Sequence, residues 1–272
     1  MPIITIYQGA SGDGQELADA VAQELGYRVV GREVLVEASR RYRIPEARLS
    51  EIVEKGPHWW ERLLEDVRPY RIALQAALCE LARESNVVYH GHLGHELLPG
   101  ISHVLKVLLS APIEYRIKQV RARQGLADAS ARKYIDELDK ARSRRLMEMF
   151  GSDWHDPNRY DLVLNMSKMG REGAKQVIVE AAKLEAYQPT SASIRAFNDL
   201  ALAARVHATL FASPHLKGSS LEVRAEAGHV FVKGRVDHGI EDVVTTLVKN
   251  VPGVVKITAD LFSVPPEALL GA

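Results

Sequence analysis

Three glycines near the N-terminus separate an apolar segment from a segment with helical spacing. Gly9, Gly12 and Gly14 follow the apolar residues 3–7, and apolar side chains recur at the spacing of a helix from Leu17 onward. A glycine loop between a buried strand and a helix N-terminus points backbone N–H groups at an anion, and the helix dipole also attracts negative charge. The chemistry that such a loop supports is the binding of phosphate groups.

The loop has the glycine spacing of a phosphate-binding loop but lacks its positive charge. The pattern is glycine, any four residues, glycine, lysine, and then serine or threonine. Gly9 and Gly14 occupy the two glycine positions. Gln15 stands at the lysine position, and Glu16 stands at the position of serine or threonine. The segment therefore predicts either a phosphate site that takes its cation from elsewhere in the chain, or an ordinary glycine turn.

Three arginines later in the chain can supply that charge. Arg116 and Arg123 are spaced to lie on one face of a helix. Arg142 falls within an apolar stripe of the long helix that follows, with Asp139 at the edge of the stripe. An arginine on an inward face requires a partner, usually an anion, unless it extends past the core edge to water. These arginines predict a lid that closes over a polyphosphate, neutralises a transferring phosphoryl group and excludes water.

A short histidine cluster, His90, His92 and His95, follows a predicted strand. The spacing does not bring three ring nitrogens to one centre, and no cysteine or acidic partner stands beside them at ligand spacing. We therefore expect these histidines to contact a loop or a substrate rather than to bind a metal.

The overall composition excludes several classes of protein. Lysine and arginine number 35, as do aspartate and glutamate, so the formal net charge is zero and a general nucleic-acid coat is not expected. Cys79 is the only cysteine, which rules out an intramolecular disulfide and suits a reducing compartment. We find no apolar run long enough for a membrane span and no signal peptide. These features predict a cytoplasmic protein.

The elements that must position these residues alternate between strand and helix. Short apolar runs predict strands at residues 3–7, 27–30, 86–89, 103–109 and 162–165. Patterns with helical spacing separate the runs. Alternation of strands and helices of these lengths predicts an α/β fold with a doubly wound parallel sheet.

The character of the sequence changes after residues 187–193, which we interpret as a linker between domains 1–186 and 194–272. The second domain is expected to be a small α+β unit. Its alternating apolar and polar residues predict a hairpin with a turn at Ala227-Gly228. Two helices and a final strand complete this domain, at residues 194–212, 239–250 and 254–261.

The first domain resembles the cytidylate kinase-like family, a branch of the P-loop nucleoside monophosphate kinases, over about residues 1–185. The likeness is carried by Arg116 and Arg123 and by the segments 9–14, 139–142, 154–157 and 160–168. The resemblance implies a P-loop kinase-type core. It also implies transfer of the ATP γ-phosphate to a pyrimidine nucleoside monophosphate such as CMP, with ATP and Mg²⁺ as cofactors.

The same resemblance assigns roles to individual residues. Those that would bind the donor phosphates are Gly9, Ala10, Ser11, Gly12, Asp13, Gly14, Gln15 and Glu16. The catalytic residues of the lid would be Arg116, Arg123, Asp139 and Arg142. Arg32 and His92 would lie towards the acceptor nucleotide.

Four positions depart from the family pattern. His92 stands where members often carry an arginine, and Gly31 stands where an aspartate is common. Gln15 lacks the charge of the usual lysine or arginine, and Leu17 stands where many members carry the threonine that binds magnesium. Loss of the loop cation removes several kcal/mol of transition-state stabilisation unless another group replaces it.

Residues 194–262 resemble a BON domain through their glycine and valine pattern. The matching positions are Val223, Gly228, Val230, Val232, Gly234, Val236 and the segment 251–254. BON domains are associated with contact to membranes or lipids and with binding of ligands or partners. This copy lacks an obvious basic or aromatic membrane face, which favours a protein partner or a small ligand over a membrane surface.

Two functions of different classes follow from these patterns. One is a nucleotide kinase with a C-terminal BON module. The alternative is a catalytically degenerate nucleotide-binding regulatory protein that signals through its BON domain, as the residues at Gln15 and Leu17 suggest. A purely structural or interaction role is a third possibility.

Overall fold

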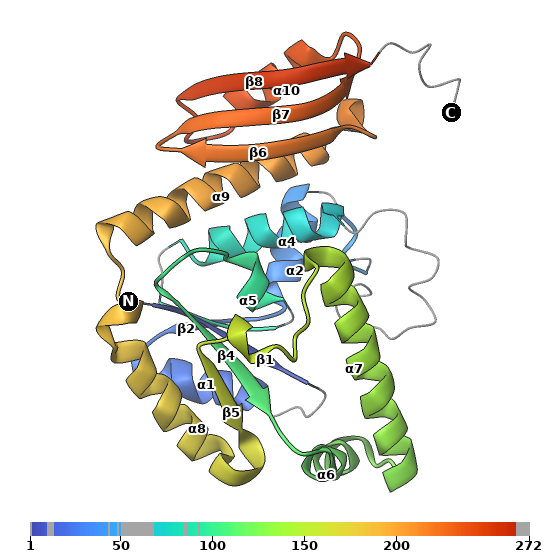
Figure 1. The fold of residues 1–272 in the computed structure, drawn as a ribbon, viewed down its shortest axis with the longest axis vertical. Helices are drawn as coiled ribbons and strands as arrows, with labels where there is room; N and C mark the ends of the chain where they lie inside the picture. The colour runs from blue at the N-terminus through green and yellow to red at the C-terminus, as the bar shows by residue number, and fades with distance from the viewer. Residues whose placement is uncertain are drawn as a thin grey trace.

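The computed structural model describes residues 2–9, 14–42, 44–47, 49, 68–83, 86–91 and 93–264 of the chain. Its centre is a sheet of five parallel strands in the order β2-β3-β1-β4-β5 (Figure 1). The strands are β1 (Ile3–Gln8), β2 (Arg28–Val30), β3 (Val87–His90), β4 (Val104–Ser110) and β5 (Leu162–Asn165). The predicted doubly wound parallel sheet is confirmed, with strand boundaries within two residues of those expected.

Helices cover both faces of this sheet, which explains why β1 is a nearly continuous apolar run. The residues of β1 alternate between two core clusters, with Ile3 and Tyr7 in one and Ile4 and Ile6 in the other. One face is covered by α1 (Gly14–Leu25) and α8 (Met166–Lys183), and the opposite face by α2 (Glu33–Tyr42), α4 (Arg68–Leu81) and α5 (Gly94–Leu97).

Two further helices follow β4 and carry Arg116, Arg123 and Arg142, from which the sequence predicts a lid. They are α6 (Ile113–Gln124) and α7 (Asp128–Phe150), and they pack against each other. Short 3-10 turns complete the chain at Pro157–Arg159, Glu185–Tyr187 and Pro214–Leu216. None of the described helices has the length and the hydropathy that a membrane crossing requires.

A second, smaller sheet lies towards the C-terminus and has the strand order β6-β7-β8. β6 (Ser220–Glu226) and β7 (His229–Asp237) form the predicted antiparallel hairpin, and β8 (Lys256–Val264) pairs with β7 in parallel. The hairpin requires glycine at position 234, because φ is 146° there and a Cβ would lie 2.0 Å from the Ser220 carbonyl oxygen. α10 (Glu241–Lys249) covers this sheet with Val244 and Val248 buried.

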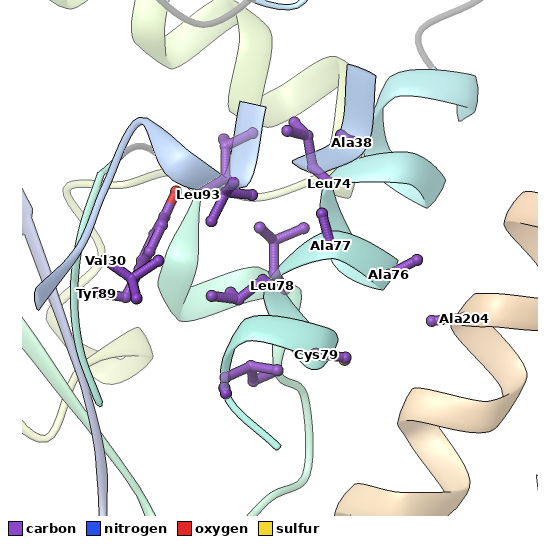
Figure 2. Packing of buried hydrophobic residues seen from close by; sticks show 14 of the residues in the cluster. Val30, Ala38, Leu74, Ala76, Ala77, Leu78, Cys79, Tyr89, Leu93 and Ala204 are labelled. Carbon is purple, nitrogen blue, oxygen red and sulfur yellow. The ribbon is translucent and has the colours of Figure 1, made fainter. Parts of the chain in front are cut away.

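Helix α9 (Ser191–Phe211) lies between the two sheets and contributes to both cores (Figure 1). Phe197 and Ala204 belong to the core of the larger sheet, whereas Val206 and Leu210 belong to the core of the smaller one. Figure 2 shows Ala76 of α4 on the side of that helix that faces Ala204. These small side chains let the two helices approach closely.

Candidate functional site

The site centres on the C-terminal end of β1, where the predicted phosphate-binding loop begins. Gly9 follows the strand directly, and α1 begins at Gly14. A Cβ at Gly9 would lie 3.0 Å from Nη2 of Arg116 and 3.3 Å from the Trp154 ring. The lid therefore already contacts the first residue of the loop, and the absence of a side chain there makes this approach possible.

Arg142 of α7 reaches the same end of β1. Its Nη1 donates a hydrogen bond to the carbonyl oxygen of Gln8 at 3.0 Å. Burial lowers the pKa of the Arg142 guanidinium, although the nearby Tyr7 and Asp139 oppose that shift. The inward-facing arginine expected from the sequence is thus placed at the loop, where it contacts a main-chain oxygen.

Asp139 links the two lid helices. Its Oδ2 accepts a hydrogen bond from Nη2 of Arg116 at 2.6 Å, and the two side chains are only 17% and 13% exposed. A charge-assisted contact in so protected a position restricts the Arg116 side chain to one orientation. In this structure Asp139 positions an arginine that faces the loop.

The third lid arginine contacts the first turn of α1. Arg123 lies 3.4 Å from the Glu16 carboxylate, and Arg171 of α8 also forms an ion pair with Glu16. These side chains are 42–50% exposed, so each pair contributes little to stability. Glu16 therefore holds neither arginine strongly.

Arg171 was not among the residues predicted for the site. Arg171 follows the predicted strand 162–165 by a few residues and comes directly after Gly170. Gly170 has a φ of 64°, which kinks α8 at this point. No sequence pattern indicates that this kink places Arg171 beside α1, because the contact joins residues far apart in the chain.

Gln15, at the lysine position, is held by hydrogen bonds. Its Nε2 donates to Oδ1 of Asp19 at 3.0 Å, and its Oε1 lies 3.2 Å from Nδ1 of His90. Burial, assisted by Arg142, lowers the pKa of His90 to about 4. His90 is therefore neutral near pH 7, and neither it nor Gln15 brings a positive charge to the loop.

A buried cluster of aromatic side chains surrounds Tyr7, the residue that precedes Gln8 in β1. The ring of Tyr7 lies within 6.5 Å, centroid to centroid, of the rings of His95, Trp154 and Tyr160. Burial raises the pKa of Tyr7 to about 12. Burial lowers the pKa of His95 to about 4. His95 thus forms part of an aromatic core rather than facing the loop.

Arg145, one helical turn beyond Arg142 on α7, is 2% exposed. Burial and the neighbouring charge of Arg142 lower the pKa of its guanidinium to about 10. Arg142 is half-buried and Arg145 is buried, and the two guanidinium groups together raise the positive potential at the end of β1, so an anion placed there would be stabilised. Arg145 was not among the predicted site residues, although it lies three positions after Arg142 and therefore on the same side of the helix.

Several predicted site residues are placed elsewhere or lie outside the described chain. Arg32 forms a 3.0 Å ion pair with Glu46, and its side chain is 65% exposed and does not contact the other arginines. His92 and residues 10–13 are outside the described part of the chain. Their roles therefore remain predictions.

The described residues do not fit a magnesium site held by the protein itself. Among them, no group of three or more histidine, cysteine, aspartate or glutamate side chains is arranged to hold a metal. Glu16 is the acidic residue in the first turn of α1, and its carboxylate is already paired with two arginines. Mg²⁺ is commonly held by substrate phosphates and water together with one or two protein groups.

Known proteins resemble this chain in sequence. Residues 3–168 match the Cytidylate kinase-like family, and residues 198–266 match the BON domain. A cytidylate kinase from Pyrococcus horikoshii is 33% identical over 102 residues, which are 38% of this chain and 52% of that protein. Thus the chain spans about half the length of this relative. A cytidylate kinase from Ignicoccus hospitalis is 29% identical over 177 residues, covering 64% of this chain and 96% of the relative.

Similarity in structure supports the same assignment at the level of fold. An uncharacterized protein from Eubacterium ventriosum superimposes with a TM-score of 0.53 at 18% identity, covering 66% of this chain and 97% of its own. The family match extends over more than half of the chain and includes β1, the start of α1, the lid helices and β5. The chain therefore belongs to the cytidylate kinase-like family and carries a C-terminal BON domain.

Proposed function

We propose that the protein transfers the γ-phosphate of ATP to a pyrimidine nucleoside monophosphate such as CMP. The observation that carries the proposal is the convergence of Arg116 and Arg142 on Gln8 and Gly9 at the end of β1. Two guanidinium groups at this point take the place of the missing loop lysine. Family membership supports a kinase-like phosphotransferase, and the choice of CMP rests on the names of the relatives.

Each part of the site has a role in this proposal. The backbone of residues 9–14 and the N-terminus of α1 hold the donor phosphates of ATP. Arg116, Arg123 and Arg142 stabilise the charge that spreads over the transferring phosphoryl group, while Asp139 orients Arg116. Closure of α6 and α7 excludes water from the reaction. Magnesium, brought by the nucleotide, would neutralise part of the phosphate charge.

The proposal also covers the residues that bind the acceptor nucleotide and the boundary between the two domains. We assign Arg32 and His92 to the acceptor nucleotide, with Arg32 leaving Glu46 when that nucleotide binds. The domain boundary lies within residues 187–193, and the BON domain recognises a protein partner or a small ligand.

A coupled assay with ATP and CMP, dCMP or UMP tests this function. We expect turnover with at least one monophosphate, and an R116A variant should lower kcat/KM about a hundredfold or more. R132A is a matched control, because Arg132 lies on α7 with 51% of its side chain exposed and pairs with Glu114 at 3.8 Å. Folded protein that turns over none of the three monophosphates would refute the proposal.

A regulatory nucleotide-binding protein is the second candidate. It is favoured by Gln15 and Glu16, whose side chains are engaged with protein groups. In this case ATP should raise the melting temperature while no phosphate is transferred. If neither ATP nor any monophosphate changes the melting temperature, both candidates are excluded.

A further inference from the structure

A pocket with charged residues at its rim lies where the α/β core, α9 and the BON hairpin meet. It has a volume of about 400 Å³, within the range of small-molecule sites. Its polar rim and open wall are formed by Arg83, Arg195, Asn198, Arg205, Gly228 and Gly253. Three segments that are distant in sequence thus contribute to one cavity, which is separate from the arginines at the end of β1.

The charge at the rim of this pocket is predominantly positive. Arg205 is committed to the protein, because it forms an ion pair with Glu80 and donates to the Pro252 carbonyl oxygen at 2.8 Å. Arg83 is 61% exposed and lies 3.9 Å from Glu80, too far for a strong hydrogen bond. Arg195 is exposed on α9. The guanidinium groups of Arg83 and Arg195 are therefore available to an incoming ligand.

The acidic residue in the pocket wall, Asp199, is hydrogen-bonded to the tip of the hairpin. Asp199 accepts a 2.8 Å hydrogen bond from the backbone N–H of Ala227 at the tip of the hairpin. Ala227 has a φ of 48°, a left-handed conformation that is strained for a residue with a side chain. Asp199 thus holds the strained turn in place beside the pocket. The same hydrogen bond partly compensates the negative charge of its carboxylate.

We propose that this junction pocket binds a small molecule that carries phosphate or carboxylate oxygens. Arg83 and Arg195 would hold the oxyanion, since guanidinium groups match such groups in charge and geometry. Ala201 and Leu202 line the apolar floor, where the uncharged part of the molecule would pack. This site is additional to the nucleotide site and does not depend on the proposed kinase activity.

Thermal denaturation of the full chain, titrated with pyrophosphate and separately with citrate, tests the proposal. At a hundredfold excess over Kd we expect a rise in Tm of about 5 °C or more for at least one of them. Pyrophosphate alone would indicate a phosphate ligand, citrate alone a carboxylate ligand, and both would indicate a general oxyanion site. Absence of a shift with both probes would overturn the proposal.

Variants assign the shift to one of the two sites. R83A/R195A should weaken the apparent affinity at least about tenfold, because two charge-assisted contacts are lost. R116A, at the nucleotide site, should keep the shift.

R224A/R235A is a matched control on exposed positions of β6 and β7. Should R83A/R195A fail to fold, N198W provides a second test, because it fills the pocket from an exposed position of α9. A shift that R116A abolishes and R83A/R195A or N198W keeps would overturn the proposal.

Discussion

Gln15 shows how a single residue defines the chemistry of the loop. Its amide group bonds to Asp19 and lies near the neutral His90, whereas a phosphate-binding loop normally has an ammonium group at this position. The positive charge at the end of β1 comes from α6 and α7 instead. At the residue scale, the loop has no cation at position 15, and the nearby positive charge comes from Arg116 and Arg142.

Replacing Gln15 with lysine should strengthen the interaction with ATP. Lysine adds a cation beside the phosphates, but Asp19 would also attract it, so we expect a gain of about tenfold in ATP affinity or kcat/KM. Titration calorimetry and the coupled assay would measure the change. Q15M is the neutral control, and the argument fails if Q15K is no better than Q15M.

Individual site residues were predictable only where local pattern determines their position. Arg142 was found because it interrupts an apolar stripe, a feature visible within one helix. Arg171 was missed because its contact, Glu16, is 155 positions away in the sequence. Ion pairs between exposed, distant residues leave no periodic signal in a single sequence.

At the scale of elements, the contact between α4 and α9 joins the kinase-like core to the BON domain. Glu80 of α4 is 9% exposed and forms ion pairs with Arg205 of α9 and with Arg41 of α2. The same carboxylate therefore connects three helices. Loss of one partner would leave a largely buried charge without its full set of contacts.

Replacing Arg205 with glutamine should lower the free energy of unfolding by about 2 kcal/mol or more. The E80Q/R205Q double variant should lose less than the sum of the two single variants, because the groups interact directly. Urea denaturation gives each value. K233Q is the exposed control, since Lys233 and Asp260 are 65% and 59% exposed and their pair should be worth less than about 1 kcal/mol. Additive losses for E80Q and R205Q would contradict the interpretation.

Elements were predicted well where hydrophobic periodicity is simple. The hairpin was correct because β7 alternates between buried and exposed side chains on either side of a glycine turn. The double role of α9 could not be predicted, because its small and large apolar residues occupy two faces and do not show which core each face meets. Tertiary packing decides that question.

Acid sensitivity is a property of the whole molecule. Burial lowers the pKa of three histidines, His90, His95 and His207, from 6.5 to about 4. These residues belong to β3, α5 and α9 and so sample separate parts of the fold. Between those pH values the unfolded chain binds protons that the native chain does not.

The free energy of unfolding should therefore fall as the pH decreases from about 6.5 to about 4, by up to about 1.4 kcal/mol per pH unit for each histidine. Urea denaturation at several pH values would measure the slope. H207Q should lower this slope by up to about 1.4 kcal/mol per pH unit, because one of the three histidines is removed. An H207Q slope equal to that of the wild type would contradict the assignment.

The position of α9 has a consequence for how the two halves can be separated. A cut before Ser191 would remove Phe197 and Ala204 from the larger core, and a cut after Phe211 would deprive the smaller sheet of Val206 and Leu210. Either fragment would present a freshly uncovered apolar surface to water. The BON domain is thus not an appendage that the kinase-like core can shed, and loss or exchange of one half during evolution would require the surface of the other to be redesigned.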